Sequence, residues 1–178
     1  MGAQLVSETV VYWTTEIDLL GHLYLAASGA GLCKLALGQE NDQTFQSWLA
    51  RVIQPSRLVR QRSPPIDTAL AELGAYLSGR LQSFETPLDL RGTPFQRRVW
   101  AEVAGIPYGG TATYGEIAAR IGHPKAVRAV GSANGANPLP ILVPCHRVIG
   151  VDGGLRGYGG GLDIKAALLE LERSALSR

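Results

Sequence analysis

Residues 113–148 read TYGEIAARIGHPKAVRAVGSANGANPLPILVPCHRV, and this stretch decides the fold of the second half of the chain. It opens on a capping box, in which Thr113 and Glu116 each satisfy a free backbone N–H and so start a short helix. A turn then leads to Pro124, a residue suited to the first position of a helix, which predicts a second helix ending near Asn134. Two short helices joined by a tight turn form a helix-turn-helix pattern, which also occurs in many proteins that never bind DNA.

The first half of the chain has a sheet pattern followed by helices. Residues 9–15, 19–27 and 32–37 are rich in β-forming side chains, and a Gly-containing turn separates the last two, so we expect a meander. Apolar residues then recur at helical intervals in 42–53 and 66–77. This half therefore predicts a small sheet with accompanying helices.

We place a domain boundary where the pattern loses its period, just before the composition shifts toward Gly, Ala and short helices. The boundary gives an α/β domain over residues 1–86 and a helical domain over residues 87–178. In the second domain, apolar residues at helical spacing predict further helices over about 95–103 and 163–172. The expected fold class is therefore α/β in the α+β sense.

The composition excludes several classes of protein. The 178 residues, 46% of them hydrophobic, suffice for one good-sized core or two small ones. The net charge of +2 is far below that of a protein that coats nucleic acid, so any DNA contact must come from local clustering of basic residues. The start of the chain lacks the pattern of an export signal, and no apolar run is long enough to cross a bilayer, so we expect no membrane partner.

Few side chains in the sequence can ligate a metal. The chain has two cysteines, Cys33 and Cys145, and three histidines without metal-ligand spacing. We expect no metal and no cofactor, and we expect the reduced thiols of a cytoplasmic protein. Cys33 falls in a predicted strand and is interpreted as structural.

Cys145 follows an apolar stretch stiffened by prolines, residues 138–144, so it should be held rigidly and buried. A cysteine must lose its proton to act as a nucleophile, and its neighbour His146 is the obvious base. Adjacent side chains of an extended segment point to opposite faces, so contact between the two requires a bridging water or a bend. The alternative interpretation is an inert thiol in the core.

The sequence resembles the O6-alkylguanine-DNA alkyltransferases in five separated elements. They are Pro-Cys-His-Arg-Val at 144–148, Arg-Ala-Val-Gly at 128–131, Asn137-Pro138, Tyr158 with Gly159 to Gly161, and Leu168-Leu169 followed by Glu172. The resemblance is close from Phe95 to Glu172 and general before that. It implies a ribonuclease-H-like N-terminal domain and a winged-helix-like C-terminal domain with the helix-turn-helix.

The resemblance also implies a reaction, which is DNA repair by direct reversal. Cys145 would be nucleophile and alkyl acceptor, His146 its base through a water, and Glu172 the residue that orients His146. Tyr114 would stabilise the leaving guanine, and Asn137 would brace the active-site segment. The substrate would be O6-alkylguanine, and also O4-alkylthymine, flipped out of DNA. Each protein molecule would act once, because a thioether does not hydrolyse.

Two further groups of residues take their roles from the same resemblance. The substrate pocket would be lined by Asn134, Pro140, Val148, Tyr158, Gly159 and Gly160, with Gly159 standing where many relatives have serine. Double-stranded DNA would be contacted by Arg128, which fills the space of the flipped base, and by Tyr114, Lys125, Ala126, Ala129, Gly131 and Ser132. This contact would lie in the minor groove and have little sequence specificity. We expect a monomer in solution, with assembly on DNA left open, and a place at the nucleoid if the source is bacterial.

Three alternatives remain at this point. One is a relative that binds lesions without repairing them, but those proteins lack the cysteine. Another is a helix-turn-helix regulator in which Cys145 is incidental or a redox sensor; it predicts a symmetric dimer on a specific operator. The last is a thiol hydrolase that uses Cys145 and His146 on small esters or amides, and repeated turnover would identify it.

Overall fold

The computed structural model describes residues 8–38 and 40–177 and begins with a four-stranded sheet. The strands are β1 (Thr9–Ile17), β2 (Gly21–Ser28), β3 (Gly31–Leu37) and β4 (Arg57–Arg60), in the order β3-β2-β1-β4. Strands β1 to β3 are antiparallel neighbours, which confirms the predicted meander. The sequence did not indicate β4, a four-residue strand that pairs parallel to β1 and is too short to produce a clear pattern.

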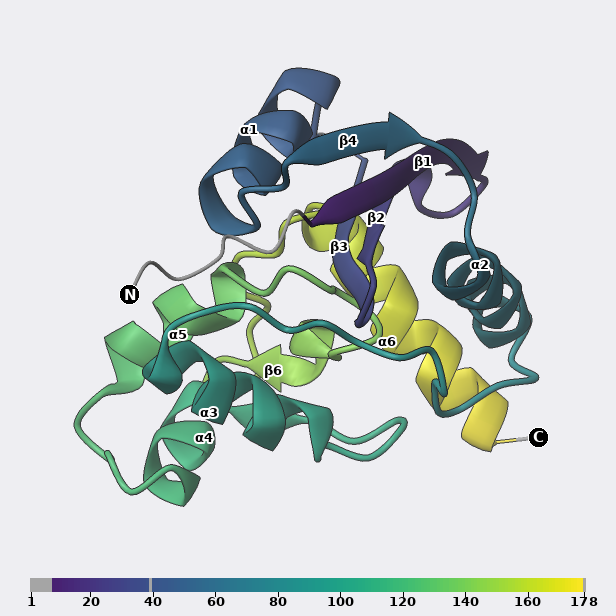
Figure 1. The fold of residues 1–178 in the computed structure, drawn as a ribbon. Helices are drawn as coiled ribbons and strands as arrows, with labels where there is room; N and C mark the ends of the chain where they lie inside the picture. The colour runs from purple at the N-terminus through teal and green to yellow at the C-terminus, as the bar shows by residue number, and fades with distance from the viewer. Residues whose placement is uncertain (1–7, 39, 178) are drawn as a thin grey trace, which may run out of the picture.

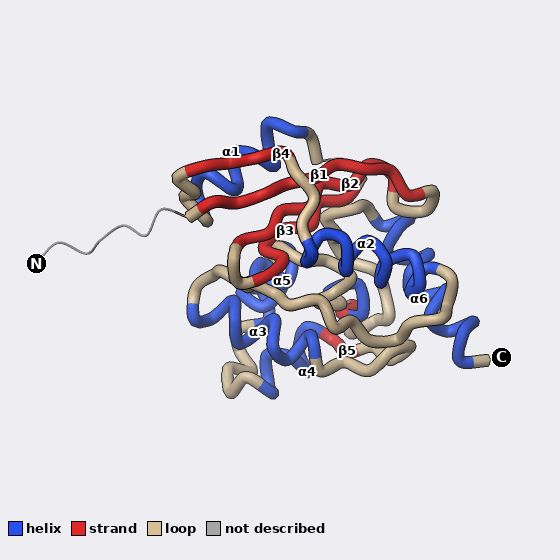
Figure 2. Tube along the Cα trace, turned by 45° about the vertical axis from the view of Figure 1, so that its right-hand side comes forward, coloured by secondary structure: helices blue, strands red, loops and turns tan. Residues whose placement is uncertain are grey.

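Helices of the first half lie on both faces of the sheet (Figures 1 and 2), and β2 and β3 are its most buried strands. Helix α1 (Asp42–Val52) packs through Phe45 and Leu49 on one face, whereas α2 (Pro64–Leu77) packs on the other. Alternate residues of β2 serve the two faces: Leu25 belongs to the core beneath α2, and Tyr24 to the core beneath α1. Two apolar layers therefore fix this sheet between its helices.

The second half is helical, as predicted, with one small pair of strands. Its elements are α3 (Pro94–Ala104), β5 (Ala112–Thr113), α4 (Tyr114–Arg120), α5 (Val127–Gly135), the 3-10 helix η1 (Cys145–Arg147), β6 (Val148–Ile149) and α6 (Leu162–Leu176). The capping box at the start of α4 is present. Helices α4 and α5 form the helix-turn-helix, packed on α3 (Figure 1).

The prediction that Pro124 begins the second helix of the helix-turn-helix is wrong, because α5 begins at Val127. The backbone N–H of Ala126 donates to the carbonyl of His123 at 2.8 Å, which closes a turn. This bond spans three residues, one fewer than in an α-helix, so the regular helix starts only after the turn. Pro124 and Lys125 therefore belong to the turn.

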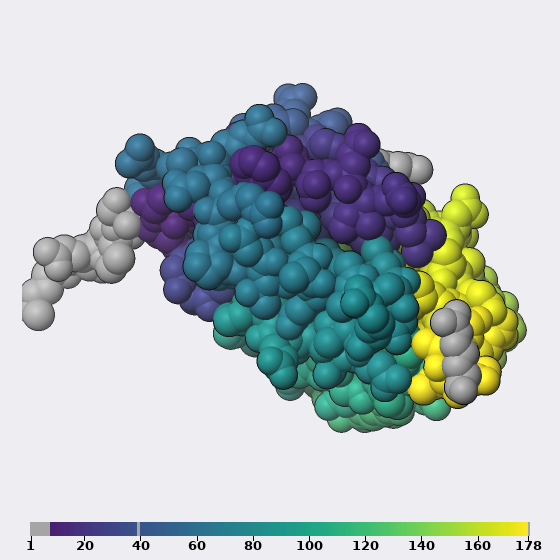
Figure 3. Space-filling view, turned by 90° about the vertical axis from the view of Figure 1, so that its right-hand side faces the viewer, coloured from purple at the N-terminus to yellow at the C-terminus, as the bar shows by residue number. Residues whose placement is uncertain are grey.

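The two halves join along the free edge of β3. The N–H of Leu32 donates to Pro87 O at 2.8 Å, and the N–H of Leu35 donates to Pro138 O at 2.8 Å. Gly31 has a φ of +146°, and a Cβ there would lie 2.3 Å from Pro87 O, so only glycine fits this approach. On the face shown in Figure 3, atoms of the first half lie directly against those of the second. The sheet edge thereby holds the segment that leads to Cys145.

Two features of the sequence concern membranes and export. Among the helices of the described residues, none combines the length and the apolar character that a membrane span requires. The expectation that the chain lacks an export signal concerns its first residues. Of these, residues 1–7 lie outside the described residues.

Candidate active site and DNA-contacting surface

The backbone bends at Cys145. Residues Cys145–Arg147 form a turn of 3-10 helix, with the N–H of Cys145 donating to Val143 O at 2.7 Å and that of Arg147 to Pro144 O at 2.9 Å. A bend was one of the two possibilities that the residues left open for contact between Cys145 and His146, the other being a bridging water. The turn buries both side chains, leaving Cys145 4% exposed and His146 fully buried.

The segment before the turn is strained and braced. Ile141 has a φ of +74°, a conformation that a β-branched residue rarely adopts. Asn137 holds this segment, because its Nδ2 donates to Val143 O at 2.8 Å and its Oδ1 accepts from Leu139 N at 3.0 Å. The amide of Asn137 thus substitutes for backbone partners that the tight turn cannot provide.

Glu172, on α6, lies at the centre of a buried hydrogen-bond network. Its Oε1 lies 2.9 Å from His146 Nε2. Arg147 donates from Nη2 to Oε1 at 2.8 Å and from Nε to Oε2 at 3.0 Å. The N–H of Gly109 donates to Oε2 at 2.9 Å. Burial alone would raise the pKa of Glu172, but the hydrogen bonds from His146 and Arg147 outweigh it and lower the pKa to about 2.

One partner of Glu172 comes from the first half of the chain and was not predicted. The hydroxyl of Tyr76, on α2, donates to Oε1 at 2.6 Å and lies 3.3 Å from His146 Nε2. The sequence offered no signal for it, because a tyrosine at a core position of a helix is read as packing. Arg147 could have been singled out, since it lies within the matched pentapeptide.

The resting thiol of Cys145 is protonated at neutral pH. Burial raises the pKa of Cys145 to about 11, although hydrogen bonding from Asn137 and the charge of Lys165 oppose this. Burial also lowers the pKa of His146, against the opposing effect of Glu172, so the imidazole is neutral near pH 7. General-base catalysis requires these two protonation states, a neutral imidazole and a protonated thiol.

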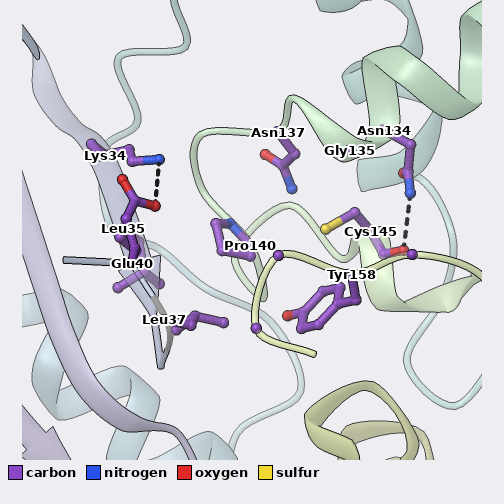
Figure 4. Close-up of a pocket in the computed structure, with 14 residues that line it drawn as sticks. Lys34, Leu35, Leu37, Glu40, Asn134, Gly135, Asn137, Pro140, Cys145 and Tyr158 are labelled. Atoms are coloured by element: carbon purple, nitrogen blue, oxygen red, sulfur yellow. Dashed lines mark hydrogen bonds and ion pairs between the residues drawn. The ribbon is translucent and has the colours of Figure 1, made fainter. Parts of the chain in front are cut away.

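Cys145 faces a small cavity of about 90 Å³ (Figure 4). Asn134, Asn137, Pro140, Tyr158, Gly159 and Gly160 also line it, as the sequence analysis expected of most of the pocket residues. Val148 lines neither this cavity nor the wider hollow beside it; it lies in β6, and its carbonyl accepts from Lys165 Nζ at 2.6 Å. The opposite wall comes from β3 and includes Lys34, which pairs with Glu40 at 3.1 Å. The sequence gave no indication of that wall.

A wider hollow of about 520 Å³ adjoins the cavity on the side of α5. Tyr114, Val127 and Gly131 line it, and both hollows share Gly135 and the segment 157–159. Burial raises the pKa of Tyr114, so its hydroxyl stays protonated and able to donate. The wider hollow thus has a hydrogen-bond donor, the Tyr114 hydroxyl, in its wall.

Apart from Tyr114 on α4, the residues assigned to DNA contact lie on α5 and in the turn just before it. Lys125, Arg128, Ala129 and Ser132 are exposed, and Ala126 and Gly131 are partly buried. The Ser132 hydroxyl donates to Arg128 O at 3.2 Å, so it is directed along its own helix. The basic groups of this surface are therefore the exposed side chains of Lys125 and Arg128, and Arg128 is followed by the small residue Ala129.

Two remaining groups have clear structural roles. Lys165 is fully buried, and its Nζ donates to Val148 O at 2.6 Å and to Arg156 O at 2.9 Å, which fastens the loop that carries Tyr158. Cys33 is buried in β3, and burial raises its pKa to about 12. Within the described ranges, no group of three His, Cys, Asp or Glu side chains is placed to hold a metal ion.

Both halves of the chain match family models. Residues 10–90 match the ribonuclease-like domain of 6-O-methylguanine DNA methyltransferase, and residues 94–174 match its DNA binding domain. The methylated-DNA–protein-cysteine methyltransferase of Methanosarcina barkeri is 56% identical over 168 residues, which cover 93% of this chain and 99% of that protein. The protein of that name from Mycobacterium tuberculosis is 48% identical over 166 residues, covering 93% and 94%.

Solved structures resemble the whole fold. A crystal structure of the Mycobacterium tuberculosis protein in complex with DNA has a TM-score of 0.80 and 45% sequence identity, covering 93% of this chain and 94% of that one. An O6-methylguanine DNA methyltransferase from Methanococcus jannaschii has a TM-score of 0.63 at 28% identity, covering 90% and 92%. The likeness therefore extends over both halves and the site between them.

Proposed function

The chain belongs to the 6-O-methylguanine DNA methyltransferase family, and we propose that its Cys145 is the residue that accepts the alkyl group from O6-alkylguanine in DNA. The reaction repairs DNA by direct reversal and consumes one protein molecule per lesion. The observation that carries the assignment is a buried thiol on the wall of a small cavity, next in the chain to a buried histidine whose Nε2 is hydrogen-bonded to a carboxylate.

The proposed step is an in-line displacement at the alkyl carbon. The Cys145 sulfur forms a bond to that carbon while the bond from carbon to O6 breaks, and the electron pair of that bond stays with the guanine. The thiol proton passes through a water to His146 and finally to the guanine, so the products are a thioether and an intact base. Because Glu172 is a carboxylate, it stabilises the imidazolium that forms on His146.

Tyr114 and the glycines of the 157–160 segment would act on the base itself. The Tyr114 hydroxyl would donate to ring nitrogen N3 and so stabilise negative charge as the guanine leaves. The backbone of Gly159 would approach O6, and Tyr158 would form a wall beside the ring. We extend the proposal to O4-alkylthymine, which presents an alkoxy group to the same cysteine.

DNA is the partner of this chain, and we propose that α5 contacts it in the minor groove. Arg128 would occupy the space that the flipped nucleotide leaves, while Lys125, Ala126, Ala129, Gly131 and Ser132 lie against the backbone and groove. Few of these side chains reach base edges, so binding would depend little on sequence. We further propose a monomer in solution that acts in the cytoplasm, at the nucleoid in a bacterium, with domains dividing at residues 86 and 87.

The first test is intact-protein and peptide mass spectrometry after mixing with a duplex that carries one O6-methylguanine. One methyl per protein, located on Cys145 and reaching a plateau after a single turnover, is expected. The control is Cys145→Ser, which should bind the same duplex and take up no methyl. An unmodified Cys145 beside persisting lesions would overturn the assignment, and repeated turnover on small esters would favour a hydrolase.

A further inference from the structure

Tyr76 reaches the active site from the other half of the molecule. It lies on α2, in the N-terminal half, and is fully buried. Its hydroxyl donates to Glu172 Oε1 at 2.6 Å and lies 3.3 Å from His146 Nε2. The helix that covers the sheet thus places a polar group between the carboxylate and the imidazole of the C-terminal half.

The protons of this cluster can be assigned from its donors and acceptors. Glu172 is a carboxylate, so it only accepts, and the single proton of the Tyr76 hydroxyl is directed to it. The oxygen of Tyr76 then presents lone pairs toward Nε2. Because Nε2 of His146 is faced by two acceptors, it must carry the ring proton, and Nδ1 is left as the basic nitrogen. Nδ1 is buried and has no hydrogen-bond partner among the residues of 8–38 and 40–177.

We infer that Tyr76 is a positioning residue for alkyl transfer: its hydrogen bond to Glu172 weakens the attraction of the carboxylate for the imidazole proton, so that His146 stays neutral with Nδ1 free to take the thiol proton. The inference rests on the proposed function. It assigns the N-terminal domain a part in the chemistry, because without α2 the Glu172 carboxylate would lose its neutral donor.

The charged and titratable groups around His146 determine whether its pKa rises or falls when Tyr76 is replaced. They are Glu172 and Lys165 from α6, Arg147 and Cys145 from η1, Tyr76 from α2, and Tyr158, whose ring stands edge-on at 6.4 Å. Tyr76→Phe removes the hydroxyl that donates to Glu172. The ion pair between Glu172 and Arg147 remains. The carboxylate then attracts the imidazole proton more strongly, so the pKa of His146 rises and the base becomes protonated at higher pH.

Tyr76→Phe and Tyr108→Phe form a matched pair for the test. The Tyr108 ring packs edge-on against Tyr76 at 5.9 Å, and within the described part of the chain its buried hydroxyl has no hydrogen-bond partner. The measurement is the single-turnover rate of methyl transfer from an O6-methylguanine duplex as a function of pH. Tyr76→Phe should move the acid limb of the profile to higher pH by about one unit, as expected for the loss of one hydrogen bond to a charged group, so that transfer on that limb slows about tenfold. Tyr108→Phe should match the wild-type protein, and DNA affinity should be unchanged in both.

Equal profiles for the two variants, or a rate loss in Tyr76→Phe that only follows its loss of folded protein, would overturn the inference. A second measurement needs no variant: ¹⁵N NMR of histidine in the wild-type protein reports the tautomer directly. A proton on Nε2 of His146 is expected, and a proton on Nδ1 in the neutral ring would refute the assignment. Failure of the proposed function is distinguishable, because the wild-type protein itself would then acquire no methyl on Cys145.

Discussion

Asn134 Nδ2 lies 3.3 Å from the carbonyl oxygen of Cys145, so the helix that presents Arg128 is hydrogen-bonded to the residue that faces the cavity. Asn134 is buried in the last turn of α5. If α5 contacts DNA as proposed, a displacement of this helix would be transmitted to the turn that holds the thiol. One side chain, Asn134, would then link the proposed DNA-contacting surface to the proposed reaction centre.

Replacing Asn134 by alanine should loosen this link. The buried carbonyl of Cys145 would lose a donor, which costs about 1–3 kcal/mol of the free energy of unfolding. Urea denaturation measures that loss, and the single-turnover methyl-transfer rate should fall with it. The control is Ser132→Ala on the same helix, since that hydroxyl is exposed and bonds only within α5. Equal stabilities for the two variants would argue against the link.

Arg128→Ala should weaken repair of duplex DNA far more than reaction with a free O6-substituted guanine. The reason is that a free base needs no extrusion from the stack, whereas a paired one does, at a cost of a few kcal/mol. The ratio of the two second-order rate constants is the measurement. The control is Arg51→Ala, which removes one positive charge from an exposed position of α1 and should leave this ratio unchanged. Equal losses on both substrates would remove the flipping role from Arg128.

Gly159→Ser should be tolerated and should speed transfer severalfold. A Cβ at Gly159 would meet no atom within 4 Å, so the added side chain has room. Its hydroxyl would bring one more donor near O6 of the bound base, where charge develops as the alkyl group leaves. Gly159→Ala controls for the added Cβ and should transfer at the parental rate. A slower serine variant would place O6 elsewhere in the pocket.

Acid should lower the free energy of unfolding in two stages, first through His146 and then through Glu172. Burial lowers the pKa of His146 from its usual value of 6.5, so the folded state binds its proton less readily and stability falls as the pH drops below about 6.5. The pKa of Glu172 is lowered from 4.5 to about 2. Its contribution, on the order of 3 kcal/mol, is complete above pH 4.5 and disappears as the pH falls through about 2.

The variant Glu172→Gln tests the part of the acid destabilisation that comes from protonation of Glu172. The variant should lose roughly 3–5 kcal/mol at neutral pH, because Arg147 is left as a buried charge without its carboxylate. Urea denaturation at a series of pH values should show that the difference from the parent narrows below pH 4.5. Glu170→Gln, on the exposed side of the same helix, should change little. A difference that does not vary with pH would mean that Glu172 is not ionised in the fold.

Local sequence was enough to predict most of the elements of secondary structure. The meander of β1 to β3 is encoded by β-forming residues and a turn, and the capping box of Thr113 and Glu116 uses side chains three positions apart. The helices α1, α2, α3 and α6 appear where apolar residues recur at helical intervals. Strand β4 was missed because its four residues form only by pairing with β1, far away in the sequence.

For the candidate site too, some features follow from the sequence and others only from the tertiary structure. Cys145, His146 and Arg147 are contiguous, so the sequence alone makes His146 the neighbour of the thiol and predicts that either a bend or a bridging water is needed for the two side chains to interact. Only the tertiary structure decides that the chain bends there in a 3-10 turn, that Glu172 is brought to His146 from 26 residues away, and that Tyr76 completes the cluster from 70 residues away. These hydrogen bonds depend on how α2, η1 and α6 pack against one another. Contacts between elements so far apart in the chain produce no periodic sequence pattern from which they could be predicted.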